Sequence, residues 1–212
     1  IPAGDAMHLD DASVAERPFG DQVSFELDER VDIPIHSGKQ RAPGDPIPSS
    51  DPIDAATVVV KDNRAYMSIG QDPEHGDGIG MFSVHDPTMR GDITGKALWT
   101  NRTIGRTICT PSVVGDLVFQ AEYNGNIHCI DITNGKILWT YATNSRIWSS
   151  TLVADGKVYC GTEDGELVIL RTGREMKLVG KPEFFSPIYA SPVVANNLLH
   201  VATMTHLFAI GK

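Results

Sequence analysis

A pattern of apolar segments and turns recurs about every forty residues along the chain. The clearest copies are "SVVGDLVFQAEYNGNIHCIDITNGKILW", residues 112–139, and "TLVADGKVYCGTEDGELVILRTGREMK", residues 151–177. Weaker copies begin at "TVVVKDNRAYMSIG" and at "SPVVANNLLHVATMTHLFAIGK", which stops before its last turn. A fixed period of this length is typical of repeat architectures, in which each copy forms one supersecondary unit. The sequence therefore predicts four imperfect copies of one unit.

Each copy has the pattern of short strands separated by tight turns. Asp155-Gly156 and Asn196-Asn197 supply residues that tolerate positive φ, as two-residue hairpins require. Three strands with their turns and a linking fourth strand need about forty residues, the length of one propeller blade. We predict an all-β fold, a β-propeller of four-stranded blades with about four repeats. Closure by the N-terminal segment is one alternative, and the incomplete copies favour part of a seven- or eight-bladed ring.

The first 55 residues differ in composition from the rest. They hold twelve Asp and Glu against four Lys and Arg, and seven of the thirteen prolines. This composition predicts an acidic, Pro-rich arm or linker over residues 1–55, followed by propeller repeats over residues 56–212. The net charge of −9, without a stripe of Lys and Arg, excludes nucleic acid as a main partner. No apolar run is long enough to predict a transmembrane segment.

The three cysteines, Cys109, Cys129 and Cys160, show neither a CxxC spacing nor a vicinal pair. The sequence therefore signals no zinc site and no disulfide framework. Each cysteine lies in an apolar, strand-like stretch, where a free thiol acts as a small buried hydrophobic group. One disulfide, for example between Cys129 and Cys160, remains an alternative in an oxidising compartment.

The stretch "CIDITNGKILW", residues 129–139, resembles the tryptophan-docking repeat of quinoprotein-like (PQQ-type) β-propellers. The usual family form is Ala-x-Asp-x-x-Thr-Gly-Lys-x-x-Trp, and the earlier copy "VHDPTMRGDITGKALW" resembles it with an insertion after Pro87. The third copy, "VILRTGREMK", keeps Gly173 but lacks the Asp and the Trp, so its joint must be packed differently. The resemblance implies a set of structural, blade-docking residues: Asp86, Gly95, Trp99, Asp131, Gly135 and Trp139.

The motif has a physical purpose that does not depend on the family. A single blade cannot bury both faces of its sheet, so adjacent blades must be joined. An indole brings a large apolar area and one N–H donor, which suits Trp139 to the space between two twisted sheets. Gly135 permits the turn before the tryptophan, and Asp131 can accept hydrogen bonds from turn amides. We therefore interpret the motif as a joint.

The resemblance carries two functional implications. The repeat occurs in quinone-dependent dehydrogenases and in non-catalytic scaffolds similar to the outer-membrane assembly lipoproteins. The dehydrogenases are similar in having a vicinal cysteine pair over the quinone, and this chain has no Cys-Cys. We expect a non-catalytic, extracytoplasmic scaffold of the periplasm or cell envelope that binds protein or peptide partners without a cofactor. The alternative is a fragment of an alcohol or sugar dehydrogenase that uses pyrroloquinoline quinone with calcium.

One loop and one group of cationic side chains are candidate sites. The loop "GQDPEHGDGIG" contains oxygen and imidazole groups that suit a divalent cation: Asp72, Glu74, His75 and Asp77. The alternative is a solvated polar hairpin loop. Arginine and tryptophan are common anchors of recognition surfaces. The segments that enter successive blades carry such residues: Arg102, Arg106, Arg146 and Trp148. They could form a surface that binds an acidic peptide or a small anion, or the arginines could form ion pairs with loop carboxylates.

Overall fold

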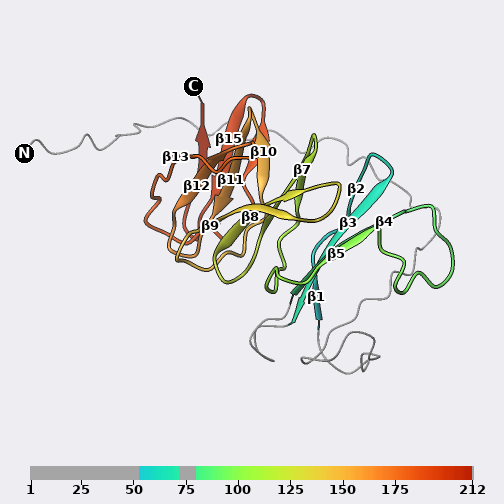
Figure 1. The fold of residues 1–212 in the computed structure, drawn as a ribbon. Helices are drawn as coiled ribbons and strands as arrows, with labels where there is room; N and C mark the ends of the chain where they lie inside the picture. Colours follow the sequence, from blue (N-terminus) through green and yellow to red (C-terminus); the bar gives the residue numbers. More distant parts are fainter. Residues whose placement is uncertain (1–52, 72–79, 212) are drawn as a thin grey trace, which may run out of the picture. The chain divides into compact units, whose positions relative to one another are not determined.

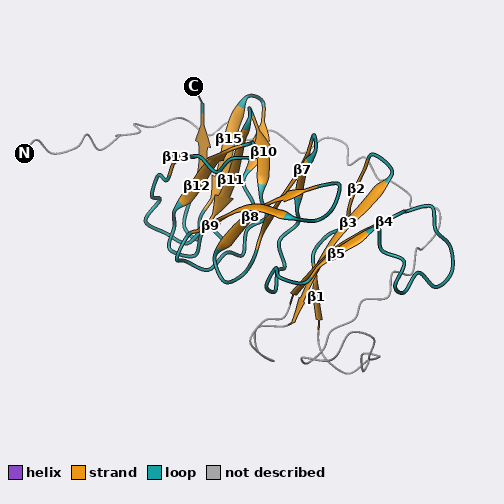
Figure 2. Ribbon diagram, in the orientation of Figure 1, coloured by secondary structure: helices purple, strands orange, loops and turns teal. Residues whose placement is uncertain are grey.

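The computed structural model describes residues 53–71 and 80–211, and these are all-β (Figure 1; Figure 2). Contacts divide the chain into two units, residues 1–30 and 31–212, and every described residue belongs to the second. Four antiparallel sheets follow one another along the described chain, here numbered blades 1 to 4. The predicted all-β fold of propeller blades is confirmed. Apart from its last three residues, the predicted arm lies outside the described residues.

Blade 1 has an innermost strand built from two pieces. Its strands are β1 (Ile53–Ala55), β2 (Val59–Lys61), β3 (Arg64–Gln71), β4 (Gly80–His85) and β5 (Trp99–Asn101). Both β1 and β2 pair with β3, one after the other along its length. Strand β1 therefore belongs to the sheet although its residues fall within the predicted arm.

Blades 2 and 3 are regular four-stranded meanders. Blade 2 comprises β6 (Ser112–Val114), β7 (Leu117–Ala121), β8 (Asn126–Asp131) and β9 (Ile137–Ala142). Blade 3 comprises β10 (Leu152–Ala154), β11 (Lys157–Gly161), β12 (Leu167–Arg171) and β13 (Leu178–Gly180). In each blade the strands pair in chain order, so the first strand is innermost and the fourth forms the outer edge.

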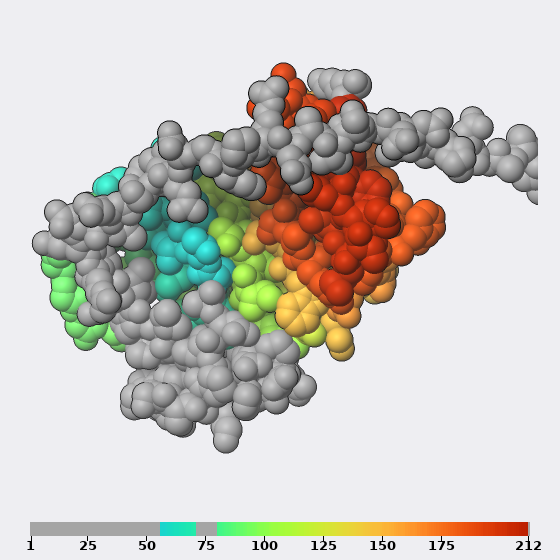
Figure 3. Space-filling model, turned by 180° about the vertical axis from the view of Figure 1, so that it is seen from behind, coloured from blue at the N-terminus to red at the C-terminus, as the bar shows by residue number. Residues whose placement is uncertain are grey.

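Blade 4 contributes three strands to the described structure. They are β14 (Val193–Ala195), β15 (Leu198–Ala202) and β16 (Leu207–Ile210). Large apolar side chains are exposed in and around this blade, among them Phe185, Met204 and Leu207. Figure 3 shows the surface of this part of the chain in red.

The hairpin turns follow from local residue chemistry. Asp155 and Gly156 have φ values of 48° and 66°, and Asn196 and Asn197 have φ values of 51° and 61°. Only Gly, Asn and Asp adopt this left-handed region at little cost, so these pairs fix where strands reverse. These turn positions also set the register of the two hairpins, which pairs Val153 with Val158 and Val194 with Leu199.

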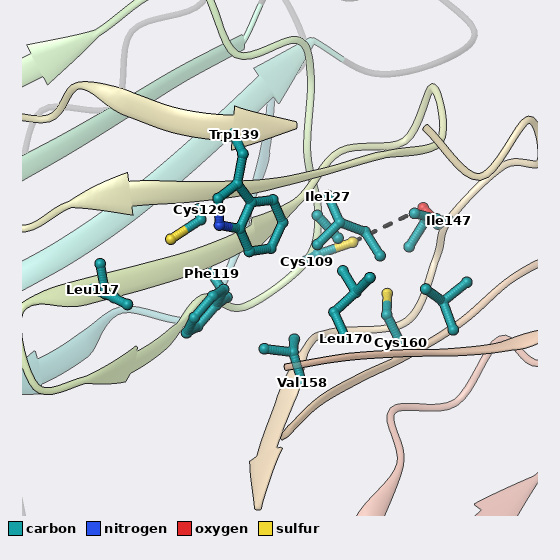
Figure 4. Packing of buried hydrophobic residues seen from close by; sticks show 12 residues of the cluster. Cys109, Leu117, Phe119, Ile127, Cys129, Trp139, Ile147, Val158, Cys160 and Leu170 are labelled. Atoms are coloured by element: carbon teal, nitrogen blue, oxygen red, sulfur yellow. Dashed lines mark hydrogen bonds between the residues drawn. The ribbon is translucent and has the colours of Figure 1, made fainter. Parts of the chain in front are cut away.

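The apolar core is divided among the spaces between blades. One cluster joins blades 1 and 2, and its fully buried members include Tyr66, Phe82, Val118 and Ile130. A second joins blades 2 and 3 (Figure 4), and its members include Phe119, Ile127, Trp139, Val158 and Leu170. A third cluster joins blades 3 and 4 around Leu167, Ile188 and Val201. Each described sheet thus buries at least one face against a neighbouring blade, as the motif requires.

Candidate functional site

In blades 2 and 3 the second turn lies against the connections that lead into and out of the blade. Tyr123, in the β7–β8 turn, donates its N–H to Arg106 O at 3.0 Å and accepts at its carbonyl from Ile147 N at 3.1 Å. Forty residues on, Glu163 N donates to Arg146 O at 2.9 Å in the same way. The repeat therefore builds one continuous face from the β7–β8 and β11–β12 turns and connections 102–111, 143–151 and 181–192. We call it the turn face.

An aromatic ring with two guanidinium groups forms the centre of the turn face. The Arg106 guanidinium carbon lies 4.1 Å from the centroid of the Tyr123 ring, and that of Arg146 lies 5.5 Å from it. Arg106 and Tyr123 are buried, whereas Arg146 is exposed. A cation over an aromatic face is attracted by the ring quadrupole, so Tyr123 helps to orient both arginines.

Trp148 extends this cluster toward blade 4. Its ring meets Tyr123 edge-to-face at 4.9 Å and Tyr189 at 6.1 Å, and its Nε1 donates to Glu163 Oε2 at 3.1 Å. Tyr189 is partly exposed, as is Trp148. The connected aromatic rings hold a cationic and aromatic surface in a fixed shape, which lowers the entropy lost on binding.

The structure brings together three of the four predicted partner-binding residues. Arg106, Arg146 and Trp148 share contacts through Tyr123, but Arg102 is exposed and does not belong to this group of contacts among the described residues. Sequence reasoning missed Tyr123 and Tyr189. Tyr123 could have been found, because it occupies the repeat position of Glu163 in a turn beside the connections.

A buried carboxylate fixes the connection beneath Arg106. Glu122 accepts from Gly105 N at 2.6 Å and from Asn126 Nδ2, and its Oε2 lies 3.2 Å from His128 Nε2. Burial raises the pKa of Glu122, but the hydrogen bonds from His128, Asn126 and Gly105 outweigh burial, so the pKa stays below its ordinary value. Glu122 therefore ties blade 2 to connection 102–111 in its ionised form.

The predicted metal loop lies outside the described residues. Asp72, Glu74, His75 and Asp77 belong to the segment between β3 and β4, so the cation hypothesis stays a prediction. In the described parts of the chain, no group of three or more His, Cys, Asp or Glu side chains is arranged to hold a metal ion.

The first blade joint places the indole of Trp99 on the following blade. Its Nε1 donates to Ile132 O at 2.9 Å, and its ring stacks on Phe82 at 5.6 Å. Gly135, with φ of 72°, lies directly beneath the ring, since a Cβ there would come within 2.8 Å of Trp99 Cδ2. Asn101 Nδ2 also donates to Gly135 O at 2.8 Å. Gly135 therefore has a second role, receiving the tryptophan of the preceding blade.

The joint between blades 2 and 3 has the same kind of indole hydrogen bond to the following blade, and it also has ion pairs. Trp139 is 9% exposed, and its Nε1 donates to Gly173 O at 3.0 Å in blade 3. Asp131 Oδ1 accepts from Thr133 N at 2.9 Å, as expected of a turn brace. Its other oxygen accepts from Arg174 Nη2 at 2.5 Å. The Thr133 hydroxyl and Arg174 lower the pKa of Asp131 to about 2.

The remaining docking residues lie in the enlarged turn of blade 1. Asp86 Oδ1 accepts from Thr88 N at 2.8 Å, within the inserted segment. Gly95 has φ of 73°, but a Cβ there would meet nothing within 4 Å. Asp92 supplies a second turn brace, because its Oδ1 accepts from Thr94 N at 2.9 Å. In the enlarged turn, Asp86 and Asp92 thus each accept a turn hydrogen bond of the kind that Asp131 alone accepts in blade 2.

The cysteines do not fit a quinone site. All three are free and buried on separate elements, so they cannot form the adjacent-cysteine platform of the quinone enzymes. Burial raises the pKa of Cys109 and of Cys129 to about 12, which makes both thiols unreactive. The alternative pairing of Cys129 with Cys160 is absent from this structure, where both thiols are free.

Four successive blades, with a tryptophan at each of the first two joints, form a β-propeller fold whose repeats resemble the quinoprotein-like, PQQ-type repeat. The matching family model is described as outer membrane protein assembly factor BamB and covers residues 83–176. BamB of Shewanella oneidensis is 28% identical over 98 residues, 44% of this chain and 25% of that protein. BamB of Escherichia coli is 28% identical over 93 residues, 43% of this chain and 23% of that protein.

One further relative is named as an enzyme, and two solved structures are similar in fold. The beta-alanine-activating enzyme of Drosophila melanogaster is 31% identical over 117 residues, 47% of this chain and 12% of that protein. The crystal structure of BamB from Moraxella catarrhalis has a TM-score of 0.61 at 23% identity, covering 76% of this chain and 47% of that one. The computationally designed Ika4 protein has a TM-score of 0.53 at 16% identity, covering 83% and 96%. Both structures support the fold alone.

The chain spans a quarter or less of the curated relatives described above. Its repeats and its resemblance to the outer membrane assembly factor are therefore established over part of those proteins only. Among the described residues there is no helix with the length and apolar character needed to cross a bilayer.

Proposed function

We propose that this chain is a non-catalytic, extracytoplasmic β-propeller scaffold that binds protein or peptide partners through its turn face. The proposal assigns no catalytic residue and no cofactor. The relatives named as outer membrane assembly factors support a place in the periplasm or cell envelope. The fold supports a scaffold because blades display loops on a rigid frame.

The observation that carries the proposal is the preorganised Arg146 guanidinium. It is exposed, it lies 5.5 Å from the Tyr123 centroid, and no carboxylate in the described parts of the chain forms an ion pair with it. The alternative in which this arginine serves a local ion pair therefore finds no support in the described residues. Trp148 and Tyr189 provide aromatic anchors on one side of it.

This geometry favours a partner segment with a carboxylate next to an apolar or aromatic side chain. The carboxylate would meet Arg146, which offers a planar, bidentate donor pair. The apolar side chain would pack on Trp148 and Tyr189, with Glu163 already satisfied by the indole N–H.

Site-specific crosslinking in living cells tests the proposal. Benzoylphenylalanine in place of Tyr189 should crosslink a defined envelope protein, and Arg146→Glu in the same chain should reduce the yield at least about tenfold. The matched charge control is Arg171→Glu, since Arg171 is exposed at the opposite end of β12. The matched crosslinker control is position 141 on β9. Equal yields from positions 189 and 141, or no effect of Arg146→Glu, would contradict the proposal.

The dehydrogenase alternative has its own test. The chain is mixed with pyrroloquinoline quinone and calcium, and quinone binding and dye-linked oxidation of alcohols and sugars are measured. The scaffold proposal expects neither a stoichiometric quinone spectrum nor turnover. Observation of both would overturn it.

A further inference from the structure

Two cysteines from neighbouring blades approach one short segment of the chain. Cys109 lies at the end of connection 102–111, where its Sγ contacts Ile147 O at 3.9 Å. Cys160 lies on β11 of blade 3, where its Sγ is 3.8 Å from Ser149 O and 3.6 Å from Ser149 Oγ. Both thiols are completely buried in the cluster between blades 2 and 3. The two sulfur atoms therefore share one closed environment.

The third cysteine is separated from this pair. Cys129 Sγ is 3.5 Å from Gly173 O, at the receiving turn of the second joint. In Figure 4 the indole of Trp139 lies between Cys129 and Cys109, while the thiols of Cys109 and Cys160 point into the same space. Besides burial, the nearby Cys109 contributes to raising the pKa of Cys160, as expected for neighbouring thiols.

We propose that Cys109 and Cys160 form a covalent crosslinking site, at which a disulfide ties blade 2 to blade 3 when the chain folds in an oxidising environment. A disulfide needs two cysteines whose backbones are close and whose side chains converge. The thiols of Cys109 and Cys160 both lie against residues 147–149 and face one space in Figure 4, so their side chains converge as a disulfide requires. The crosslink would close a loop that spans both blades.

The oxidant is a small-molecule or protein disulfide. One cysteine thiolate attacks a sulfur of that disulfide, forms a mixed disulfide and releases the first thiol of the oxidant. The second cysteine thiolate then attacks the mixed disulfide at the cysteine sulfur and releases the second thiol. The two cysteines together lose two electrons and two protons, and the oxidant is reduced to two thiols.

The order of events follows from burial. In the folded chain neither thiol is exposed, and burial raises the pKa of Cys109 to about 12, so little thiolate is present for exchange. The crosslink must therefore form before blades 2 and 3 pack together. Once formed, it is protected from reductants by the same burial.

Refolding with a defined redox pair tests the inference. The full chain is unfolded in urea with reductant and then refolded in a mixture of reduced and oxidised glutathione, or in reduced glutathione alone. Free thiols are alkylated after denaturation, and intact mass is measured. We expect one alkylated cysteine per chain after refolding with oxidised glutathione, and three after refolding with reduced glutathione alone.

Peptide mapping then identifies the bond. Cleavage on the amino side of Asp116 separates Cys109 from Cys129, which a tryptic digest alone leaves in one peptide. We expect the peptide containing Cys109 to be linked to the one containing Cys160. The control Cys129→Ser should keep the crosslink, and Cys160→Ser should abolish it. Three free thiols under oxidising refolding, or a bond that includes Cys129, would overturn the inference.

Discussion

Two joints can be compared, one between blades 1 and 2 and one between blades 2 and 3. Each uses a tryptophan at the same position of the repeat, but the surroundings of the two indoles differ. Trp99 packs on Gly135 and donates a hydrogen bond to Ile132 O. A side chain at position 135 would clash with the indole, so the receiving turn needs glycine there. Trp139 donates to Gly173 O, and Arg174 adds ion pairs to Asp131 and Asp116. The indole is therefore constant between the two joints, whereas the turn that receives it varies.

The two spaces also differ in polarity. Between blades 1 and 2, Gln120, Glu122 and His128 form a buried polar layer on strands β7 and β8 and in their turn. Between blades 2 and 3, the buried cluster is apolar and includes Cys109 and Cys160. The first space therefore combines apolar packing with buried polar side chains, whereas the second depends mainly on close apolar packing.

The largest predicted effect distinguishes the two tryptophans. Trp139→Ala should lower the free energy of unfolding by about 3 to 5 kcal/mol, because it leaves a cavity in a well-packed cluster. Trp99→Ala should cost less, about 2 to 3 kcal/mol, since its indole is only half-buried. Urea denaturation measures both. If Trp139→Ala left stability unchanged and abolished partner binding, Trp139 would belong to a site and not to a joint.

A smaller effect is expected at the glycines of the two turns. Gly135→Ala combines a φ of 72° with a clash against Trp99 and should cost about 2 to 4 kcal/mol. Gly95→Ala is the matched control, because its φ of 73° is nearly the same but its surroundings are open, and it should cost about 1 kcal/mol. Thermal or urea unfolding of both variants measures the difference. Equal costs would mean that the indole does not constrain Gly135.

The next prediction concerns acid stability at the second joint. The pKa of Asp131 is about 2 in the folded chain, below its ordinary value. A carboxyl group whose pKa is lower in the folded chain than in the unfolded chain stabilises the fold fully at pH values above its unfolded pKa. This stabilisation is lost as the pH falls through the folded pKa. Asp131→Asn should therefore flatten the decline in stability between about pH 4 and pH 2. An unchanged slope in acid unfolding curves would argue against this role.

The smallest effect is expected for the exposed partner of Asp131. Arg174→Ala should reduce stability at neutral pH only slightly, because the arginine side chain is half exposed and ion pairs of this kind are weak. It should also move the acid transition of Asp131 to higher pH, since Arg174 helps to lower that pKa. Arg171→Ala serves as the control for loss of an exposed arginine. An identical acid transition in both variants would contradict the assignment.

Much of the fold could be predicted because repetition and turn chemistry are local signals. The forty-residue period indicates blades, and Asp155-Gly156 and Asn196-Asn197 mark hairpins whose φ values are positive in the structure. The pattern could not reveal that blade 1 divides its innermost strand into β1 and β2. Short strands next to an irregular segment carry too little periodicity for that.

The candidate site could be predicted only in part, because its contacts join distant residues. Arg106, Arg146 and Trp148 follow from their place at the entry to blades, but Tyr123 joins them through ring geometry that no spacing shows. Arg174 pairs with Asp131 across 43 residues in a copy that has lost the motif. Between blades 3 and 4 the rings of Phe184 and Phe208 pack with centroids 4.9 Å apart, a contact that the repeat motif does not specify.

The most direct test of the joint is a double-mutant cycle between Trp99 and Gly135. The free energy of unfolding is measured for the parent chain, Trp99→Ala, Gly135→Ala and the double variant. Because the glycine's extra cost comes from the indole above it, Gly135→Ala should cost only about 1 kcal/mol once Trp99 is alanine, a coupling of about 1 to 3 kcal/mol. Additive costs would contradict the account, since they would mean that the indole of one blade does not rest on the glycine of the next.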